Sequence, residues 1–372
     1  MEGAFVSRGF AMFVSICLLS ISVVSASASA QPTESVETLS TKLPWTLEAG
    51  TAVSIGTAIY LIGGFRGGYY SDRITRFDPV NLTFTNETAR LPLPLVGVAG
   101  VWTGTEILMF GGQTESVNDV NFTLRFNPAT GAIRNGTNLT SSRAFSPTVW
   151  TGRYVYIFGG TVGAGNARYD VLRYDSEMDR VDVVTTASIP IYTKDATATW
   201  DGTRATLFGG GFIAPGGGFA VMTFDPATER LSYVNGTGFK GVEMGSSAQI
   251  GRYAYVFGGL EANVGIVNLV QRLRTGSTEG AQSPANLSRP LALTTAAVVG
   301  DRAYIFGGWT GGFSDTNQIQ MLRSTESSSP VLWIGIVGAI VAAVAITVTV
   351  LLLRRKRARR TQPPGAVPPT GD

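Results

Sequence analysis

Short runs of consecutive apolar residues recur along the chain at a nearly constant interval, and each run ends in a pair of glycines. Tyr154–Phe158, followed by Gly159-Gly160, is one example. The six pairs begin at Gly63, Gly111, Gly159, Gly209, Gly258 and Gly307. Their spacings of 48, 48, 50, 49 and 49 residues indicate an array of supersecondary units that bury their faces against one another. We assign all twelve glycines a structural role, at strand ends where the backbone adopts positive φ or approaches a neighbour closely.

Each unit is predicted to form four strands. In the third unit, β-branched and aromatic residues cluster in Phe145–Trp150, Tyr154–Phe158, Tyr169–Tyr174 and Val181–Val184, with Gly, Asp or Asn between them. The second strand is apolar at consecutive positions, which predicts burial on both faces in a sheet stacked between two others. No amphipathic helical pattern occurs between residues 31 and 330. Six such units predict an all-β, six-bladed β-propeller.

A further motif closes the third strand of most units, where an aromatic residue precedes Asp or Asn. Examples are Phe77-Asp78, Tyr174-Asp175 and Phe224-Asp225. Together with the turn glycine, the apolar strand and Gly-Gly, this pattern resembles the kelch repeat over about 300 residues. The fifth and sixth units depart from it, with Leu273-Arg274 and Leu322-Arg323. The resemblance implies a kelch-type propeller fold rather than one particular activity.

The sixth unit contains only three predicted strands, at residues 294–299, 303–306 and 317–322. The N-terminal segment Val36–Leu43 ends in Leu-Pro, as the predicted fourth strand of the first unit does at Leu91-Pro92. We infer that this segment supplies the outer strand of the last blade and closes the ring. Burial of Val36, Leu39 and Leu43 is expected to stabilise the fold by about 1.5–3 kcal/mol each, as an upper estimate.

Both ends of the chain carry targeting signals. Arg8 precedes the apolar stretch Ala11–Val24, and Ala28-Ser29-Ala30 fits a signal-peptidase cleavage site. Val331–Leu353 is uncharged and long enough to cross a bilayer as a helix. The basic cluster Arg354–Arg360 follows it and places that side in the cytoplasm. We therefore expect a single-pass protein of the cell (plasma) membrane, with its propeller outside the cytoplasm.

The predicted domains follow from these features. They are a signal peptide (1–30), the propeller (31–324), a stalk (325–330), a transmembrane helix (331–353) and a basic, proline-rich cytoplasmic tail (354–372). Between residues 31 and 330, 22 Lys and Arg residues face 24 Asp and Glu residues, so the exported part is close to neutral. Nucleic acid is not an expected partner, because its binding requires a clustered excess of basic residues.

The composition limits the available chemistry. The chain has no histidine, and its single cysteine, Cys17, lies in the predicted signal peptide. The usual general base and the usual zinc and copper ligands are therefore missing. Some kelch propellers are copper radical oxidases whose metal is held by tyrosine and histidine, and this chain lacks the histidines. We expect no metal, no cofactor and no catalytic residues.

Loops that precede the inner strands and loops that follow Gly-Gly should emerge on the same face of the propeller, where loops on a rigid scaffold concentrate function. Aromatic and charged side chains there are suited to binding a protein or a glycan through stacking and bidentate hydrogen bonds. The candidate binding residues are Arg66, Tyr69, Tyr70, Arg143, Lys194, Glu243, Arg289 and Trp309. Other residues expected on this face are Asp72, Glu115, Asp119, Tyr192, Asp195, Glu261 and Asp315.

The expected function is non-catalytic recognition at the cell surface. One alternative is an extracytoplasmic sugar mutarotase or epimerase, as in some six-bladed kelch propellers that act on sialic acid, with Glu243 paired to Arg289 or Arg143 in the central pocket. Another is a structural envelope protein. Seven Asn-x-Ser/Thr sequons in the exported part suggest a glycoprotein. The glycosylation candidates are Asn81, Asn86, Asn121, Asn135, Asn138, Asn235 and Asn286.

Overall fold

The computed structural model describes residues 31–325 except 117, 164–165, 190–194, 210–220, 235–237, 278–279 and 313. Residues Glu34–Thr325 form one compact unit. Every regular element in the described part is a β-strand, so the predicted all-β structure is confirmed. That part contains no helix long and apolar enough to cross a membrane. The predicted signal peptide, transmembrane helix and cytoplasmic tail lie outside the described residues.

Six four-stranded antiparallel sheets occur among the described residues, each with its strands ordered from an inner to an outer strand. The first two consist of β3 (Thr51–Ile55), β4 (Ala58–Ile62), β7 (Arg73–Asp78) and β8 (Thr83–Arg90), and of β9 (Ala99–Trp102), β10 (Ile107–Phe110), β11 (Thr123–Asn127) and β12 (Ala132–Gly136). The next two consist of β13 (Thr148–Trp150), β14 (Tyr154–Phe158), β17 (Asp170–Asp175) and β18 (Arg180–Ser188), and of β19 (Thr197–Trp200), β20 (Ala205–Phe208), β21 (Val221–Asp225) and β22 (Arg230–Val234). The last two consist of β24 (Ser246–Ile250), β25 (Tyr253–Phe257), β28 (Val270–Arg274) and β29 (Gly280–Gln282), and of β30 (Thr295–Val299), β31 (Arg302–Phe306), β32 (Ile319–Thr325) and β1 (Thr33–Thr38).

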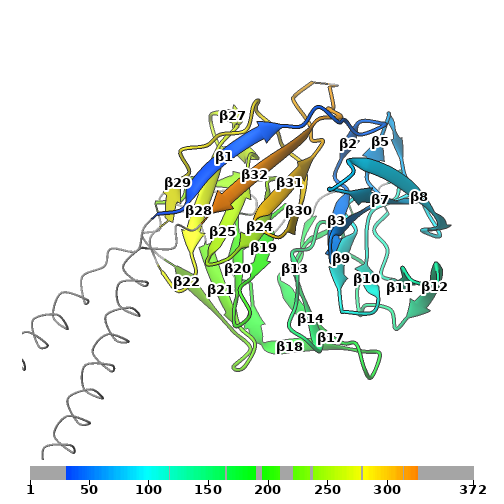
Figure 1. Cartoon of the computed structure of the whole chain (residues 1–372). Coiled ribbons are helices and arrows are strands. Elements are labelled where there is room, and N and C mark those ends of the chain that lie inside the picture. The colour runs from blue at the N-terminus through cyan, green and yellow to red at the C-terminus, as the bar shows by residue number, and fades with distance from the viewer. Residues whose placement is uncertain are drawn as a thin grey trace, which may run out of the picture. The chain divides into compact units, whose positions relative to one another are not determined.

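The sixth sheet joins the two ends of the compact unit. Its outer strand is β1, which lies beside β32, and Figure 1 shows these blue and orange strands running in opposite directions. β1 begins and ends earlier than the segment 36–43 expected from the sequence. Beyond β1 the contact continues through single hydrogen bonds, from Leu39 N to Ile319 O (2.9 Å) and from Leu43 N to Asn317 O (2.8 Å). Pro44 has no N–H to donate, and the next hydrogen bond of this segment runs from Leu47 N to Thr316 O at 3.3 Å.

The inner strands β3, β9, β13, β19, β24 and β30 contact one another in this order, and β30 contacts β3 again, so they form a closed ring. One residue just before each inner strand has a φ between 51° and 63°. It lies 14 residues before the first glycine of the Gly-Gly pair in the same unit. These residues are Ala49, Gly97, Phe145, Asp195, Met244 and Leu293. Five backbone hydrogen bonds of 2.7–2.9 Å link them around the ring, each from one residue's N–H to the carbonyl of its counterpart in the preceding sheet. We call the end of the sheets that carries these six residues and the Gly-Gly pairs the loop face.

The Gly-Gly pairs that the structure describes in full lie at the seams between neighbouring sheets. Gly112 N donates to Arg143 O at 2.9 Å, and a Cβ on Gly111 would lie only 2.1 Å from the same oxygen. Gly307 and Gly308 have the same relation to Leu47 O, across the seam between the last unit and the first. A side chain at the first glycine would overlap the neighbouring backbone, so these pairs have the close-approach role that the sequence predicted.

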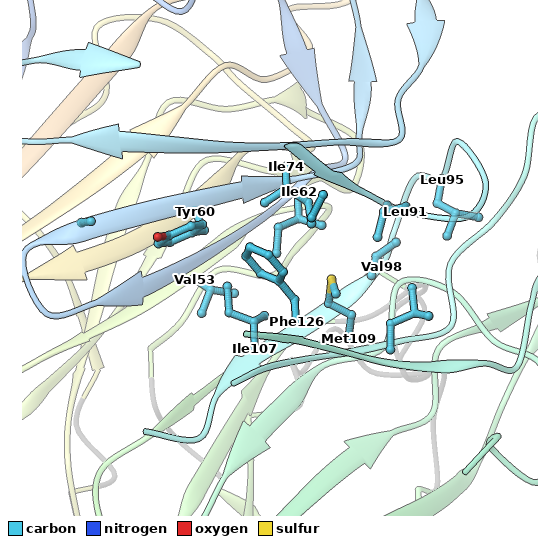
Figure 2. Packing of buried hydrophobic residues seen from close by; sticks show 13 residues of the cluster. Val53, Tyr60, Ile62, Ile74, Leu91, Leu95, Val98, Ile107, Met109 and Phe126 are labelled. Atoms are coloured by element: carbon cyan, nitrogen blue, oxygen red, sulfur yellow. The ribbon is translucent and has the colours of Figure 1, made fainter. Parts of the chain in front are cut away.

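Apolar side chains from neighbouring sheets meet between the sheets. Figure 2 shows Tyr60, Ile62 and Ile74 of the first sheet packed against Met109 and Phe126 of the second. The Tyr60 and Phe126 rings meet edge to face, with centroids 6.1 Å apart. The alternate β4 residues Ile59 and Leu61 belong instead to the core shared with the sixth sheet. Each second strand therefore faces two cores, which explains why its apolar residues are consecutive.

A buried ion pair fastens β1 to the fifth sheet. The Glu34 side chain is completely buried, and its Oε1 accepts from Arg272 Nη1 at 2.6 Å and from the Tyr255 hydroxyl at 2.7 Å. The Ser283 hydroxyl donates to the other carboxylate oxygen. These contacts add charge-assisted hydrogen bonds to the β1–β32 pairing and anchor β1 across a second seam.

Candidate functional site

In the described part of the chain, short hairpins extend the loop face after three of the Gly-Gly pairs. In the first unit, β5 (Phe65–Arg66) and β6 (Tyr69–Tyr70) form a hairpin that pairs with β2 (Leu47–Glu48). Gly67 and Gly68 turn this hairpin with positive φ values, which glycine adopts at little cost. The corresponding elements of the third and fifth units are β15 (Thr161–Val162), β16 (Asn166–Ala167), β23 (Val242–Glu243), β26 (Leu260–Glu261) and β27 (Gly265–Ile266).

A cavity of about 560 Å³ opens on the loop face between loops of the first and last units; we call it the loop-face cleft. Phe65 and Trp309 contribute aromatic rings, and Glu48 and Asp315 contribute carboxylates. The Trp309 indole N–H donates to Gly312 O at 3.0 Å, which holds this ring in place. The remaining lining residues are Thr46, Gly68, Gly312 and Ser314.

The two carboxylates of the cleft interact directly. Burial, the negative charge of Asp315 and a hydrogen bond between the two carboxyl groups raise the pKa of Glu48 to about 7. One oxygen of Glu48, Oε2, is buried without a hydrogen-bond partner. Neither carboxylate forms an ion pair with any residue that the structure describes. The cleft therefore holds half-buried acidic groups whose charge no described lysine or arginine balances.

Two of the predicted site residues, Arg66 and Arg143, are buried. Arg66 donates to Gly63 O, Leu61 O and Thr75 Oγ1, and its guanidinium lies 4.8 Å from the centre of the Trp45 ring. Its pKa is lowered to about 9, chiefly by burial and also by the charge of Arg73. Arg143 is only 1% exposed, and its guanidinium contacts Asp170 at 2.7 Å. Burial lowers its pKa as well, against the opposing effect of Asp170. Both guanidinium groups support the backbone beneath the loops.

The other predicted residues are distributed over the loop face. Tyr69 is 74% exposed on the β5–β6 hairpin, and Tyr70 packs edge to face on Phe65 with ring centroids 6.0 Å apart. Arg289 is exposed, and Glu243 lies half-buried on β23. Within the described residues, Glu243 pairs with neither Arg143 nor Arg289. Tyr192 and Lys194 lie outside the described residues.

Of the seven predicted binding residues that the structure describes, only Trp309 lines the cleft, and the sequence analysis did not select Glu48. A signal for Glu48 did exist. Counting back 15 residues from each Gly-Gly pair reaches Glu48, Lys194 and Glu243 in the first, fourth and fifth units. Two of these three positions were selected from the sequence, so aligning the units on their glycines would have added the third.

The described sequon asparagines all have exposed side chains, which is required for a bulky glycan. They are Asn81, Asn86, Asn121, Asn135, Asn138 and Asn286. The Asn121 amide nitrogen donates to Leu139 O at 3.2 Å, so a glycan there would replace a hydrogen bond. Asn235 lies outside the described residues.

Comparison with known families finds a repeat motif in the first sheet. The Kelch motif matches residues 50–88, which span β3, β4, β7 and nearly all of β8. This match and the all-strand, multi-sheet structure fit a kelch-type family. The motif suggests a protein-binding propeller module. No curated protein matches the chain.

Proposed function

We propose that the six sheets are the blades of a kelch-type propeller that recognises a protein partner at the cell surface through its loop face. The loop-face cleft carries this proposal, because it combines aromatic rings with acidic groups that no described cation neutralises. A lysine or arginine side chain of the partner is the complementary group. It would pair with Glu48 and Asp315 and lie over the Trp309 ring.

The direction of the strands supports display of this face. β32 begins near the loop face, where Ile319 pairs with Phe306, and ends at Thr325 at the opposite end of the sheet. The chain thus leaves β32 far from the cleft and continues toward the proposed transmembrane helix at 331–353. Glycans on the exposed sequons belong to the same proposal of a cell-surface protein.

The enzyme alternative has less support. The central cavity within the ring has a volume of about 200 Å³, and Asp195 is the single carboxylate among its described lining residues. The carboxylates of the loop-face cleft are hydrogen-bonded to each other, whereas retaining glycosidases hold their two carboxyl groups about 5–5.5 Å apart. Among the described lining residues, neither place supplies the separated acid and base that sugar hydrolysis or epimerisation requires.

An array of cell-surface proteins and glycans, probed with the purified full-length protein, tests the proposed function. We expect saturable binding to at least one protein that is lost in the double variant Glu48→Gln, Asp315→Asn and weakened in Trp309→Phe. Glu243→Gln, at the equivalent position of the fifth unit, is the matched control and should bind as the wild type does. Binding that survives the double variant, or that occurs only to glycans, would contradict protein recognition through this cleft.

A further inference from the structure

The inner strands surround a second cavity at the end of the ring opposite the loop face, and we call it the channel mouth. Three consecutive inner strands end there in tryptophan, at Trp102, Trp150 and Trp200. In their sheets these residues pair with Ile107, Val155 and Ala205, the first or second residues of the next strands, far from the Gly-Gly pairs. The tryptophans line one cavity of about 490 Å³, to which all six inner strands contribute.

The hydrophobic cores between the sheets support one side of each of the three indole rings. Each packs against the hydrophobic core between its own sheet and the preceding one, and each remains half-buried rather than enclosed. At the same position of the first, fifth and sixth sheets stand Ser54, Gln249 and Val298. The mouth therefore has a continuous aromatic arc on one side and smaller side chains on the other. A purely structural role, in which the indoles cover the cores, explains the contacts on their inner faces. It does not explain why the three indoles line one shared cavity.

The lining of this mouth carries no charged side chain among its described residues. A charged ligand would therefore lose its hydration without gaining an ionic partner. Polar groups are nevertheless present. The Ser54 hydroxyl is buried without a hydrogen-bond partner, and the Gln249 amide nitrogen is held by Gly251 O at 3.0 Å and Thr275 Oγ1 at 3.1 Å. The site suits a neutral molecule with an apolar face and with hydroxyl groups at its edge.

We propose that this channel mouth binds a neutral carbohydrate, with one pyranose ring stacked on the tryptophan arc. The C–H face of such a ring would pack on the indoles, and its hydroxyl groups would pair with Ser54 and Gln249. The cavity volume falls within the range of about 300–1,000 Å³ typical of small-molecule sites. The site lies at the opposite end of the channel from the loop-face cleft, and it does not depend on the function proposed for that cleft.

Tryptophan fluorescence and calorimetry on the full-length protein, in a detergent without a sugar headgroup, test this proposal. The probes are glucose, galactose, mannose and N-acetylglucosamine, with glucuronic acid as the charged counterpart of glucose. We expect saturable binding of at least one neutral sugar and at least tenfold weaker binding of glucuronic acid. Trp150→Ala should weaken binding at least tenfold, whereas Trp309→Phe on the loop face should leave it unchanged.

Two results would overturn the site. One is the absence of saturable binding by every neutral sugar in the panel, and the other is equal affinity for glucose and glucuronic acid. Ser54→Ala removes a single oxygen atom and keeps the test decisive if the Trp150 variant fails to fold. This variant should bind sugar severalfold more weakly at an unchanged melting temperature. Unchanged affinity would contradict the proposed contact between the sugar and Ser54.

Discussion

Replacing Glu34 by alanine removes a carboxylate that three side chains contact across the seam between the fifth and sixth sheets. Arg272 and Tyr255 donate to Oε1 at 2.6 and 2.7 Å, and Ser283 donates to Oε2. The Glu34 side chain is 0% exposed and that of Arg272 is 10% exposed, so solvent cannot substitute for the lost contacts. Tyr255 keeps its hydrogen bond to Ser324 at 2.8 Å, so the main loss is the ion pair between Glu34 and Arg272.

Breaking a buried ion pair by removing one partner costs about 3–5 kcal/mol. That is a large share of the roughly 5–15 kcal/mol that stabilises a typical domain. At about 2 °C per kcal/mol for a domain of this size, the melting temperature should fall by roughly 6–10 °C. Glu34→Gln keeps the shape and part of the hydrogen bonding, and its melting temperature should fall by less.

Differential scanning fluorimetry of the full-length protein measures the effect of Glu34→Ala. Limited proteolysis should in addition show earlier cleavage within residues 31–44, because β1 detaches first. Glu37→Ala is the matched control, since Glu37 is on the same strand with its side chain exposed, and it should melt as the wild type does. If Glu34→Ala and Glu37→Ala melt at the same temperature, the ion pair does not fasten β1 and the reasoning is refuted.

Three further predictions follow from the same seams and from the cleft. Deleting residues 31–44 should abolish cooperative unfolding, which a calorimetric scan would detect; a single sharp transition at the wild-type temperature would contradict this. Gly111→Ala should lower the free energy of unfolding by well over the roughly 1–2 kcal/mol that a positive φ costs by itself, because the new Cβ meets Arg143 O. Gly56→Ala, whose Cβ has no atom within 4 Å, should lose only that smaller amount in denaturant titrations. Equal losses in the two variants would argue against the seam contact. Folding raises the pKa of Glu48 from 4.5 to about 7, so the wild type should lose stability as pH rises through this interval. The melting temperature of Glu48→Gln should exceed that of the wild type at pH 8 and equal it near pH 4. A difference in melting temperature that does not change with pH would exclude the pKa shift.

Much of the fold could be predicted from the chain because its signals are local. Gly-Gly pairs, apolar runs and turn residues act on the backbone within a few residues, and the strands formed where these signals stand. The N-terminal strand was harder to place. Only the Leu-Pro similarity suggested it, and β1 (Thr33–Thr38) begins earlier than the segment 36–43 because its pairing is set by β32 and by the Glu34 contacts.

The candidate site was predicted only in outline. Placing charged and aromatic loop residues on one face selected Trp309, which lines the cleft, and it also selected Arg66 and Arg143, which are buried. Whether a loop arginine faces solvent or turns back to backbone carbonyls depends on the shape of the hairpin around it. Glycine spacing does not encode that shape.

The amino-acid sequence by itself determined the strand content, the period of the units and the glycines at their seams, because these depend on contacts that repeat from one unit to the next. The tertiary structure alone decided which distant groups meet. Glu34 and Arg272 are 238 residues apart, and Glu48 and Asp315 belong to the first and last units, yet ring closure makes both pairs neighbours. The three tryptophans likewise share one cavity because their strands stand side by side around the channel. The two acidic contacts each occur once in the ring, so the repeated pattern of the sequence does not reveal which distant group each carboxylate meets.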